Sequence, residues 1–265
     1  MARLRTLSAT LLIVGLILPL VPLGLWSFAR GWRFPDLTPK TLTLQPWLYA
    51  LSDQSGVLTS LALTTGIALL VTVLCISIGL PAGRALGRYQ FRGKALVELL
   101  ILAPIIVPGV AVVLGVQTVF IGLGLNNTVT GVVLVHLIPA LPYMVLVMAG
   151  VFAAYDKKAE DQARSLGASQ WQVFRHVTLP AILPGVIAAS AFTFLVSWGQ
   201  YILTLTIGGG RVQTLPLLLF QFAASGRNDI TGAIAVIYIL PGVLIVMLTA
   251  RNVTGRSTAL TGLGR

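Results

Sequence analysis

The sequence predicts an all-α polytopic membrane protein with six transmembrane helices and a folded cytoplasmic loop. Its 265 residues are 56% hydrophobic and only 9% charged, and the mean hydropathy is +0.92. These values are far from those of soluble domains. The charged residues are separated by long uncharged intervals. Hydrocarbon offers no partner for backbone N–H and C=O groups, so each spanning segment is expected to be a helix.

Five long uncharged intervals lie along the chain, and a spanning helix needs about 20 apolar residues. Four intervals have room for one span each. The interval from Glu98 to Asp156 has room for two, and Gly122–Asn127 divides it, because Gly and Asn favour a tight reversal. The six predicted spans are Leu7–Phe28, Val57–Leu80, Leu96–Ile121, Val129–Ala154, Ile182–Ile207 and Ile230–Ala250.

Local features of the first four spans refine this assignment. Arg3 and Arg5 precede the first span as in a secretory signal peptide, but the apolar run is too long and no small-x-small motif follows it, so we expect a retained helix. The single cysteine, Cys75, excludes an intramolecular disulfide and is expected to be buried. Kinks are predicted in the third and fourth spans by four prolines: Pro104, Pro108, Pro139 and Pro142.

The distribution of basic residues predicts the orientation. A net charge of +11 could indicate nucleic-acid binding, but the Lys and Arg residues are spread over successive loops rather than gathered in one patch. By the positive-inside bias, both termini are expected to be cytoplasmic. All but five of the 18 Lys and Arg residues lie on that side, the five being Arg30, Arg33, Lys40, Arg211 and Arg227.

Two connections are predicted to be external. Within Ala29–Gly56, the segment Thr43–Leu51 resembles a short helix at the membrane surface, where Trp47 and Tyr49 would act as aromatic anchors. Within the connection from Gly208 to Asn228, Thr214-Leu215-Pro216 begins an apolar patch that re-enters or lies on the membrane. The chain contains no phosphate-binding G-x-x-x-x-G-K-[ST] sequence.

The third connection, Tyr155–Pro180, is cytoplasmic and has the strongest local signals. Asp156 is a good N-cap for a helix in which Glu160 precedes Arg164 at the favourable i, i+4 spacing. Gly167 then permits a chain reversal. We therefore predict a helix followed by a turn.

A second short helix is predicted to follow. Ser169 and Gln172 match a capping box, and Trp171 and Phe174 fall on one side of a helix that Pro180 is expected to interrupt. One interpretation of this helix-turn-helix is a hairpin that lies on lipid headgroups.

A second interpretation follows from a resemblance. The loop resembles the E-A-A-x-x-x-G, nine residues, I-x-L-P pattern of the membrane subunits of binding-protein-dependent ABC importers. Asp161, Gln162 and Ala163 stand at E-A-A, and Gly167 matches the glycine. Asp for Glu keeps the charge, whereas Gln for Ala alters how closely the helix can pack. The residues at I-x-L-P are Val177, Leu179 and Pro180.

The resemblance extends over nearly the whole chain. The basic segment Arg84–Lys94 is similar to the loop after the second span of these permeases. Other segments resemble the branch that handles polyamines, thiamine and ferric iron: Pro104–Gly109, His136 with Pro139–Tyr143, and Ser197-Trp198 with Thr214-Leu215-Pro216.

This resemblance implies a single type I, MetI-like permease domain over residues 1–265, in a bacterial inner membrane. It implies a second permease, identical or related, two ATPase subunits and an extracytoplasmic binding protein as partners. ATP and Mg would be bound by the ATPase, with no cofactor, metal or catalytic residue in this chain. The residues expected to couple to the ATPase are Glu160, Asp161, Gln162, Ala163, Leu166, Gly167, Ala168, Leu179 and Pro180.

The substrate pathway is less clearly marked, because intramembrane charges are scarce. Glu98 is expected to pair with Lys94 at the interface. His136 either faces the pathway or is a buried imidazole bonded to a neighbouring helix, the second being favoured. Five residues of the fifth span line the pathway or serve helix packing: Ser197, Trp198, Gln200, Tyr201 and Thr204.

The nominal substrate class is polyamine-like. Related permeases commonly have acidic residues near Gly199 and Gln200, where this chain is neutral, so thiamine, ferric iron, phosphonate-type anions and sugars remain open. An ion-coupled carrier or channel is the alternative of another class, but no filter sequence or inverted repeat supports it. An intramembrane enzyme is disfavoured because His136 and His176 stand alone.

Overall fold

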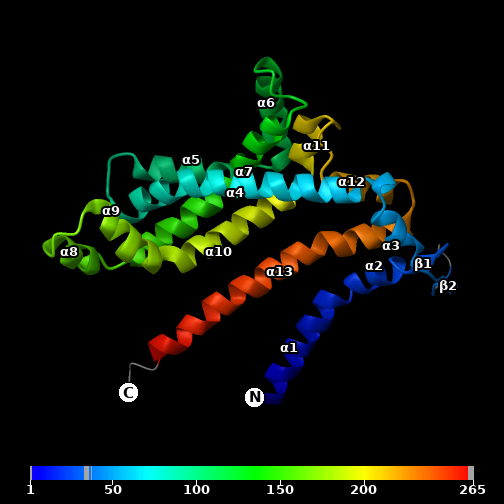
Figure 1. Cartoon of the computed structure of the whole chain (residues 1–265), viewed down its shortest axis with the longest axis horizontal. Coiled ribbons are helices and arrows are strands. Elements are labelled where there is room, and N and C mark those ends of the chain that lie inside the picture. The colour runs from blue at the N-terminus through cyan, green and yellow to red at the C-terminus, as the bar shows by residue number, and fades with distance from the viewer. Residues whose placement is uncertain (1, 33–35, 37, 262–265) are drawn as a thin grey trace. The chain divides into compact units, whose positions relative to one another are not determined.

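The computed structural model describes residues 2–32, 36 and 38–261, and these residues form helices with one small strand pair (Figure 1). Two compact units are present. The first comprises residues 1–64 and 213–243, and the second comprises residues 65–212 and 244–265. The two longest helices, α4 (Val57–Arg88) and α13 (Asn228–Thr261), each contribute residues to both units.

The first unit begins with two helices in place of the predicted first span. Helix α1 (Ala2–Ile17) and helix α2 (Leu20–Trp26) are separated by a short turn at Leu18-Pro19. Strands β1 (Ala29–Arg30) and β2 (Thr41–Leu42) then pair antiparallel, with Ala29 opposite Leu42. The sequence did not predict this pair, because two-residue strands are too short to show an alternating pattern.

The rest of the first unit consists of short helices. A short helix is present where one was predicted, as α3 (Gln45–Ala50), and is followed by the 3₁₀ turn η1 (Asp53–Ser55). The apolar patch forms α12 (Leu215–Ala224), which is too short to span a membrane. Thr64 in α4 holds the first turn of α12, because its Oγ1 accepts a hydrogen bond from the Leu215 backbone N–H at 2.8 Å.

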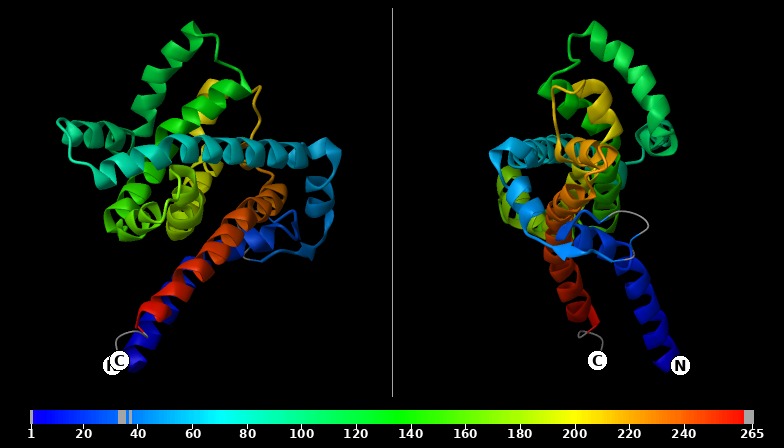
Figure 2. Two further views of the ribbon diagram at one scale, coloured as in Figure 1. Left: turned by 60° about the vertical axis from the view of Figure 1, so that its left-hand side comes forward. Right: turned by 90° about the vertical axis from the view of Figure 1, so that its right-hand side faces the viewer.

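The second unit has α7 (Val129–Ala154) at its centre. Its other helices are most of α4, α5 (Lys94–Ile106), α6 (Gly109–Gly122), α8 (Lys158–Ser165), α9 (Gln170–Val173), α10 (Leu179–Trp198) and α11 (Ile202–Gly208), with the π-helix η2 (Phe174–Thr178) between α9 and α10. Helix α10 runs beside α7 (Figures 1 and 2). The short helices α8 and α9 lie at one end of this helix pair.

Three glycines at every fourth residue bring α4 close to α7. A Cβ added at Gly79 would lie 2.5 Å from Met144 Cγ, and one at Gly83 would lie 2.5 Å from Met148 Cβ. At Gly87 an added Cβ would meet the Ala149 carbonyl oxygen. This is the small-xxx-small arrangement that lets two membrane helices approach at backbone distance, and our sequence analysis did not identify it.

Four helices are long and apolar enough to cross a membrane, or five if the bent pair α5–α6 counts as one span. This count refers to the residues that the structure describes, and the predicted six is not reached by this criterion. Helix α7 matches the predicted fourth span at both ends, and α4 begins at the predicted Val57 but continues to Arg88. The reversal between α6 and α7 is where it was predicted, with Gly124 and Asn127 at positive φ.

Two predicted spans were wrong in their course. The third is not one helix, because α5 and α6 meet at an angle of 104°. Val107, the residue before Pro108, is extended at φ −74° and ψ 131°, as the proline ring requires of its predecessor. The kink predicted from Pro108 is therefore a break, whereas α7 continues through both of its prolines.

The fifth predicted span, Ile182–Ile207, was also misplaced. Here α9, η2 and α10 form one continuous helix from Gln170 to Trp198, and α11 follows after a break. Pro180 does not interrupt it as predicted. The wider π-helical turn η2 ends at Thr178, two residues before this proline, and such local adjustment accommodates the missing N–H donor.

Candidate functional site

The connection from Tyr155 to Pro180 folds as a helix, a turn and a second helix, as predicted. The Asp156 carboxylate accepts a hydrogen bond from the Lys158 backbone N–H at 2.9 Å, at the start of α8, although the N-cap residue is Lys157 rather than the predicted Asp156. At the start of α9, the Ser169 N–H donates to Gln172 Oε1 at 2.8 Å and the Gln172 N–H donates to Ser169 Oγ at 3.3 Å. The predicted capping box is therefore confirmed.

Gly167 makes the turn between the two helices. Its φ is +85°, in the left-handed region where a side chain causes strain, and no heavy atom lies within 4 Å of a Cβ built there. Next to it, the Leu166 side chain is 89% exposed. The turn thus presents a backbone without a side chain and an unburied leucine to the exterior of this unit.

The exposed face of α8 is slightly hollowed. A groove of about 620 Å³ is lined by Lys158, Asp161, Gln162, Ser165 and Leu166. Asp161 is exposed, and its carboxylate forms a long ion pair with Lys157, at 3.9 Å. This groove combines one apolar side chain with a carboxylate, an ammonium, an amide and a hydroxyl.

The remaining predicted coupling residues do not line this groove and differ in exposure. Ala163, Ala168 and Leu179 are half-buried, and Pro180 is exposed at the start of α10. Glu160 differs from them all, because it is fully buried on the inner side of α8. The structure therefore corrects the expectation that Glu160 is available to a partner in the same way as its neighbours.

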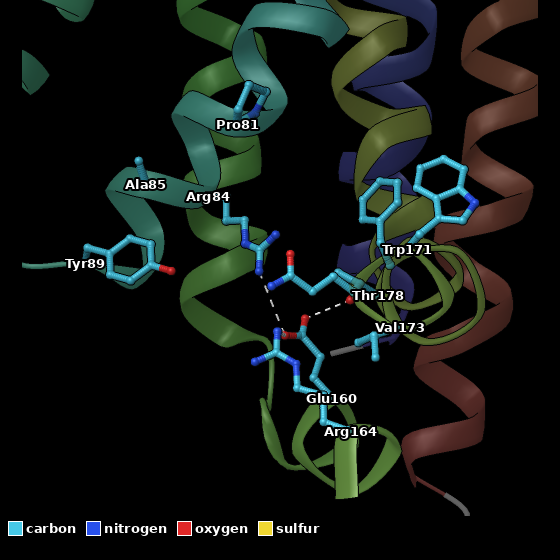
Figure 3. A pocket seen from close by; sticks show the side chains of 11 residues that line it. Pro81, Arg84, Ala85, Tyr89, Glu160, Arg164, Trp171, Val173 and Thr178 are labelled. Carbon is cyan, nitrogen blue, oxygen red and sulfur yellow. Dashed lines mark hydrogen bonds and ion pairs between the residues drawn. The ribbon is translucent and has the colours of Figure 1, made fainter. Parts of the chain in front are cut away.

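The Glu160 carboxylate is bonded within the chain (Figure 3). Its Oε1 accepts hydrogen bonds from Arg88 Nη2 at 3.2 Å and from Thr178 Oγ1 at 2.8 Å, and its Oε2 accepts one from Arg88 Nη1 at 3.3 Å. Arg84 and Arg164 each lie 3.9 Å from Oε2. The predicted Glu160–Arg164 pair is thus present, but it is the longer and more exposed part of a larger cluster.

Burial and bonding act in opposite directions on the Glu160 pKa. Burial favours the neutral acid and would raise the pKa, whereas the hydrogen bonds from Arg88 and Thr178 and the charges of Arg88 and Arg84 favour the carboxylate. The net effect lowers the pKa below the ordinary value for glutamate. Glu160 is therefore ionised at neutral pH.

A pocket of about 740 Å³ lies beside this cluster. Figure 3 shows Arg84 and Arg164 on two sides of Glu160, with Trp171 and Tyr89 farther out on the pocket wall. The pocket is bounded by the end of α4 and by the segment from α8 to η2. It marks where α8 and α9 meet the end of the helix bundle.

His136 is the buried imidazole that the sequence favoured. Its Nδ1 lies 2.9 Å from Ser197 Oγ and its Nε2 lies 2.8 Å from Thr204 Oγ1, and all three residues are at most 2% exposed. These contacts join α7 to α10 and α11. Two of the five fifth-span pathway candidates are thus engaged with His136.

The other pathway candidates lie at or near the break between α10 and α11, whereas the prediction placed them within one continuous fifth span. Trp198 ends α10, is 3% exposed and stacks on Phe194 with ring centroids 5.7 Å apart. Gln200 and Tyr201 lie in the break and are half-buried.

The predicted Lys94–Glu98 ion pair is present at 3.9 Å. Within the described residues, no group of three or more His, Cys, Asp or Glu could hold a metal ion.

Comparison with known proteins identifies related chains. The chain is 27% identical over 246 residues to the trehalose transport system permease protein SugB of Mycobacterium tuberculosis, covering 89% of both chains. It is 30% identical over 228 residues to the molybdenum transport system permease protein ModB of Mycobacterium bovis, covering 80% of this chain and 86% of that one. The spermidine/putrescine permease protein PotC of Haemophilus influenzae is 24% identical over 203 residues, with 77% and 79% covered.

Solved structures show the same fold. A bacterial ABC transporter involved in the import of the acidic polysaccharide alginate matches with a TM-score of 0.71 at 18% identity, covering 94% of this chain and 95% of that one. The alginate transporter in complex with its pentasaccharide-bound periplasmic protein matches with a TM-score of 0.62 at 15% identity, covering 94% and 93%.

Residues 79–258, which include α8, Gly167 and Pro180, match the family described as binding-protein-dependent transport system inner membrane component. This match extends over more than half of the chain. The protein therefore belongs to this family and is a multi-pass membrane permease subunit of an ABC importer.

Proposed function

We propose that this chain forms part of a solute pathway across the membrane and uses the exposed face of α8 to receive force from a separate ATPase. The observation that supports this role is the groove lined by Asp161, Gln162 and Leu166, beside a turn at which Gly167 has no side chain. ATP-driven closure of the ATPase moves α8, and the attached helices follow. The chain itself performs no chemical reaction, and ATP and Mg bind to the ATPase.

The assembly implied is a pair of permeases, identical or related, with two ATPases and a binding protein. The alginate transporter in complex with its periplasmic protein supports the last of these partners. The orientation places both termini and α8 in the cytoplasm. Cysteines introduced at Ser225 and Ser165, in a Cys75→Ala background, test this with a maleimide that cannot cross membranes. Only the Ser225 site should react from outside, and the reverse result would overturn the orientation.

For the substrate, the nominal class remains polyamine-like, and one observation favours a second candidate. The half-buried groups in the α10–α11 break are the Gln200 amide and the Tyr201 phenol, with no carboxylate between Trp198 and Ile202. Neutral hydroxyl and amide groups suit a neutral, hydroxyl-rich solute such as a sugar better than a polycation. Ligand identification on the copurified binding protein distinguishes the two classes.

The proposed role of the turn is tested by two matched glycines. Gly167 and Gly93 have φ of +85° and +86°, and both have open space around an added Cβ. Gly167→Leu and Gly93→Leu should therefore cost a similar backbone strain, about 1 to 2 kcal/mol. Only Gly167→Leu places a bulky side chain on the proposed docking face.

We expect the tagged wild-type chain and the Gly93→Leu variant to retain a copurifying ATPase in detergent, and Gly167→Leu to lose it or to uncouple hydrolysis from transport. Equal behaviour of the two variants would contradict the role of the turn. If no ATPase copurifies with the wild-type chain, the assembly is wrong and an ion-coupled carrier or channel becomes the alternative.

A further inference from the structure

In the described structure, side-chain hydrogen bonds join α8 to α4, two helices that do not follow each other in the chain. Helix α8 is joined to α7 through the non-helical residues Tyr155–Lys157, and to α9 through the turn at Gly167. Both joints can bend. A force applied to the exposed face of α8 could therefore tilt α8 alone, unless something holds its inner face to the helix bundle.

Glu160 lies at the centre of that inner face. Its carboxylate receives both terminal nitrogens of Arg88, at 3.2 and 3.3 Å, in the forked geometry that fixes direction as well as distance. The side chains are 1% and 10% exposed, so solvent screens this pair little. Thr178 in η2 donates to the same carboxylate at 2.8 Å. Glu160 thus connects α8 to two other helical elements.

Arg88 is in turn fixed to the end of α7. Its guanidinium carbon lies 4.9 Å from the Tyr155 ring centroid and 5.6 Å from that of Phe152. One turn earlier, Arg84 approaches the same carboxylate from α4. Gly87, the residue before Arg88, packs its backbone against α7. The ends of α4 and α7 and the start of the α10 helix therefore all meet α8 through one carboxylate.

The charges around this point make Glu160 hard to replace. Three guanidiniums, those of Arg84, Arg88 and Arg164, face one carboxylate in the described residues. Without the carboxylate, these cations would repel one another in a partly buried setting. The same carboxylate therefore both attracts α8 to the bundle and offsets the repulsion among these three cations.

We propose that Arg88 and Glu160 form a latch that locks α8 to the ends of α4 and α7, so that force received by α8 moves the bundle as one body. This inference rests on the proposed function and adds a pair of positioning residues to it. These two residues do not contact the ATPase. They act by preventing the force from being dissipated at the joints on either side of α8.

The test measures whether α8 moves relative to α4. Spin labels are placed at Ala159 in α8, outside the groove, and at exposed Ile78 in α4, in a Cys75→Ala background. The full chain is studied with its copurified ATPase in lipid nanodiscs. The distance between the two labels is measured by pulsed electron–electron double resonance, with and without ATP plus vanadate. The latch variants are Glu160→Gln and Arg88→Gln. The milder variants Arg88→Lys and Thr178→Val keep part of the bonding if the first two fail to accumulate.

Glu98→Gln is the matched control, because it removes the same charge from the more exposed Lys94–Glu98 pair. In the wild type and the control, the label distance should be unchanged by nucleotide. In Glu160→Gln and Arg88→Gln, the ATPase should still copurify, but nucleotide should shift the distance by about 2 to 5 Å, the size of known helix displacements. Arg88→Lys and Thr178→Val should show smaller shifts.

Two outcomes would overturn the latch. One is a nucleotide-dependent distance in the wild type, because α8 would then move freely. The other is a nucleotide-independent distance in all latch variants that retain the ATPase. Loss of the ATPase from the wild type itself would instead refute the proposed function, and the latch would be refuted with it.

Discussion

The exposed leucine beside the turn permits a quantitative test of docking. Leu166 is 89% exposed, so replacing it by alanine removes almost no contact within the chain. If the ATPase covers it, the same replacement removes three buried carbon atoms from the interface. The substitution should therefore weaken ATPase binding while leaving the stability of the permease unchanged.

The magnitude follows from the buried area. Each buried methylene contributes about 0.8 kcal/mol, so burying the three carbons of Leu166 in proportion to its 89% exposure gives about 2 kcal/mol. Every 1.4 kcal/mol corresponds to roughly a tenfold change in affinity. We expect Leu166→Ala to raise the Kd for the ATPase by about 30-fold.

The assay is a titration of the copurifying ATPase onto the permease in nanodiscs, followed by interferometry, with thermal unfolding measured in parallel. Leu123→Ala is the matched control, because Leu123 is 66% exposed and lies in the turn between α6 and α7, on the opposite predicted side of the membrane. A Kd within about threefold of the wild type, at unchanged melting temperature, would refute the docking of this face.

Three further changes have expected outcomes within the second unit. Gly83→Ala should destabilise by about 1 to 3 kcal/mol in detergent melts, because its Cβ would lie 2.5 Å from Met148. His136→Phe should cost a similar amount, about 1 to 3 kcal/mol, by leaving a buried hydroxyl without its partner. The Glu160 pKa is lowered, so its stabilising effect is present above the ordinary glutamate pKa and is lost as the pH falls towards the lowered value. The melting-temperature difference between the wild type and Glu160→Gln should therefore shrink on acidification, as followed by tryptophan fluorescence.

Each of these expectations has its own control or counter-result. Gly66→Ala in the same helix meets no atom within 4 Å, so it should be neutral or stabilising, and equal melts for both glycine variants would contradict close packing of α4 on α7. Unchanged stability of His136→Phe would show that the contacts to Ser197 and Thr204 contribute nothing. A pH-independent difference for Glu160→Gln would mean that the carboxylate does not titrate in the folded state at a lowered pKa.

Much of the membrane fold could be predicted from the spacing of charges, because hydrocarbon allows only helices between them. The local hydrogen bonds at the starts of α8 and α9 could also be predicted. Asp156, Ser169 and Gln172 bond to backbone groups two or three residues away, and such local bonds depend little on the rest of the fold. The same holds for the positive φ of Gly167.

Three features were not predicted from the sequence: the distant partners of Glu160, the size of the bend between α5 and α6, and the close packing of the α4 glycines. The i, i+4 spacing suggested Arg164 as the partner of Glu160, but the closer partners are Arg88 and Thr178, which lie 72 and 18 residues away. The bend between α5 and α6 was underestimated, because a proline shows where a helix weakens and not by how much it turns. The glycines Gly79, Gly83 and Gly87 had a readable four-residue spacing that we did not use.

That glycine row also limits how the bundle can change shape. The Met144 and Met148 side chains of α7 occupy the space that Cβ atoms at Gly79 and Gly83 of α4 would need. If α4 slid along α7, these methionines would collide with the larger side chains that lie between the glycines of α4. A change between inward-open and outward-open states would therefore move α4 and α7 together as one rigid pair.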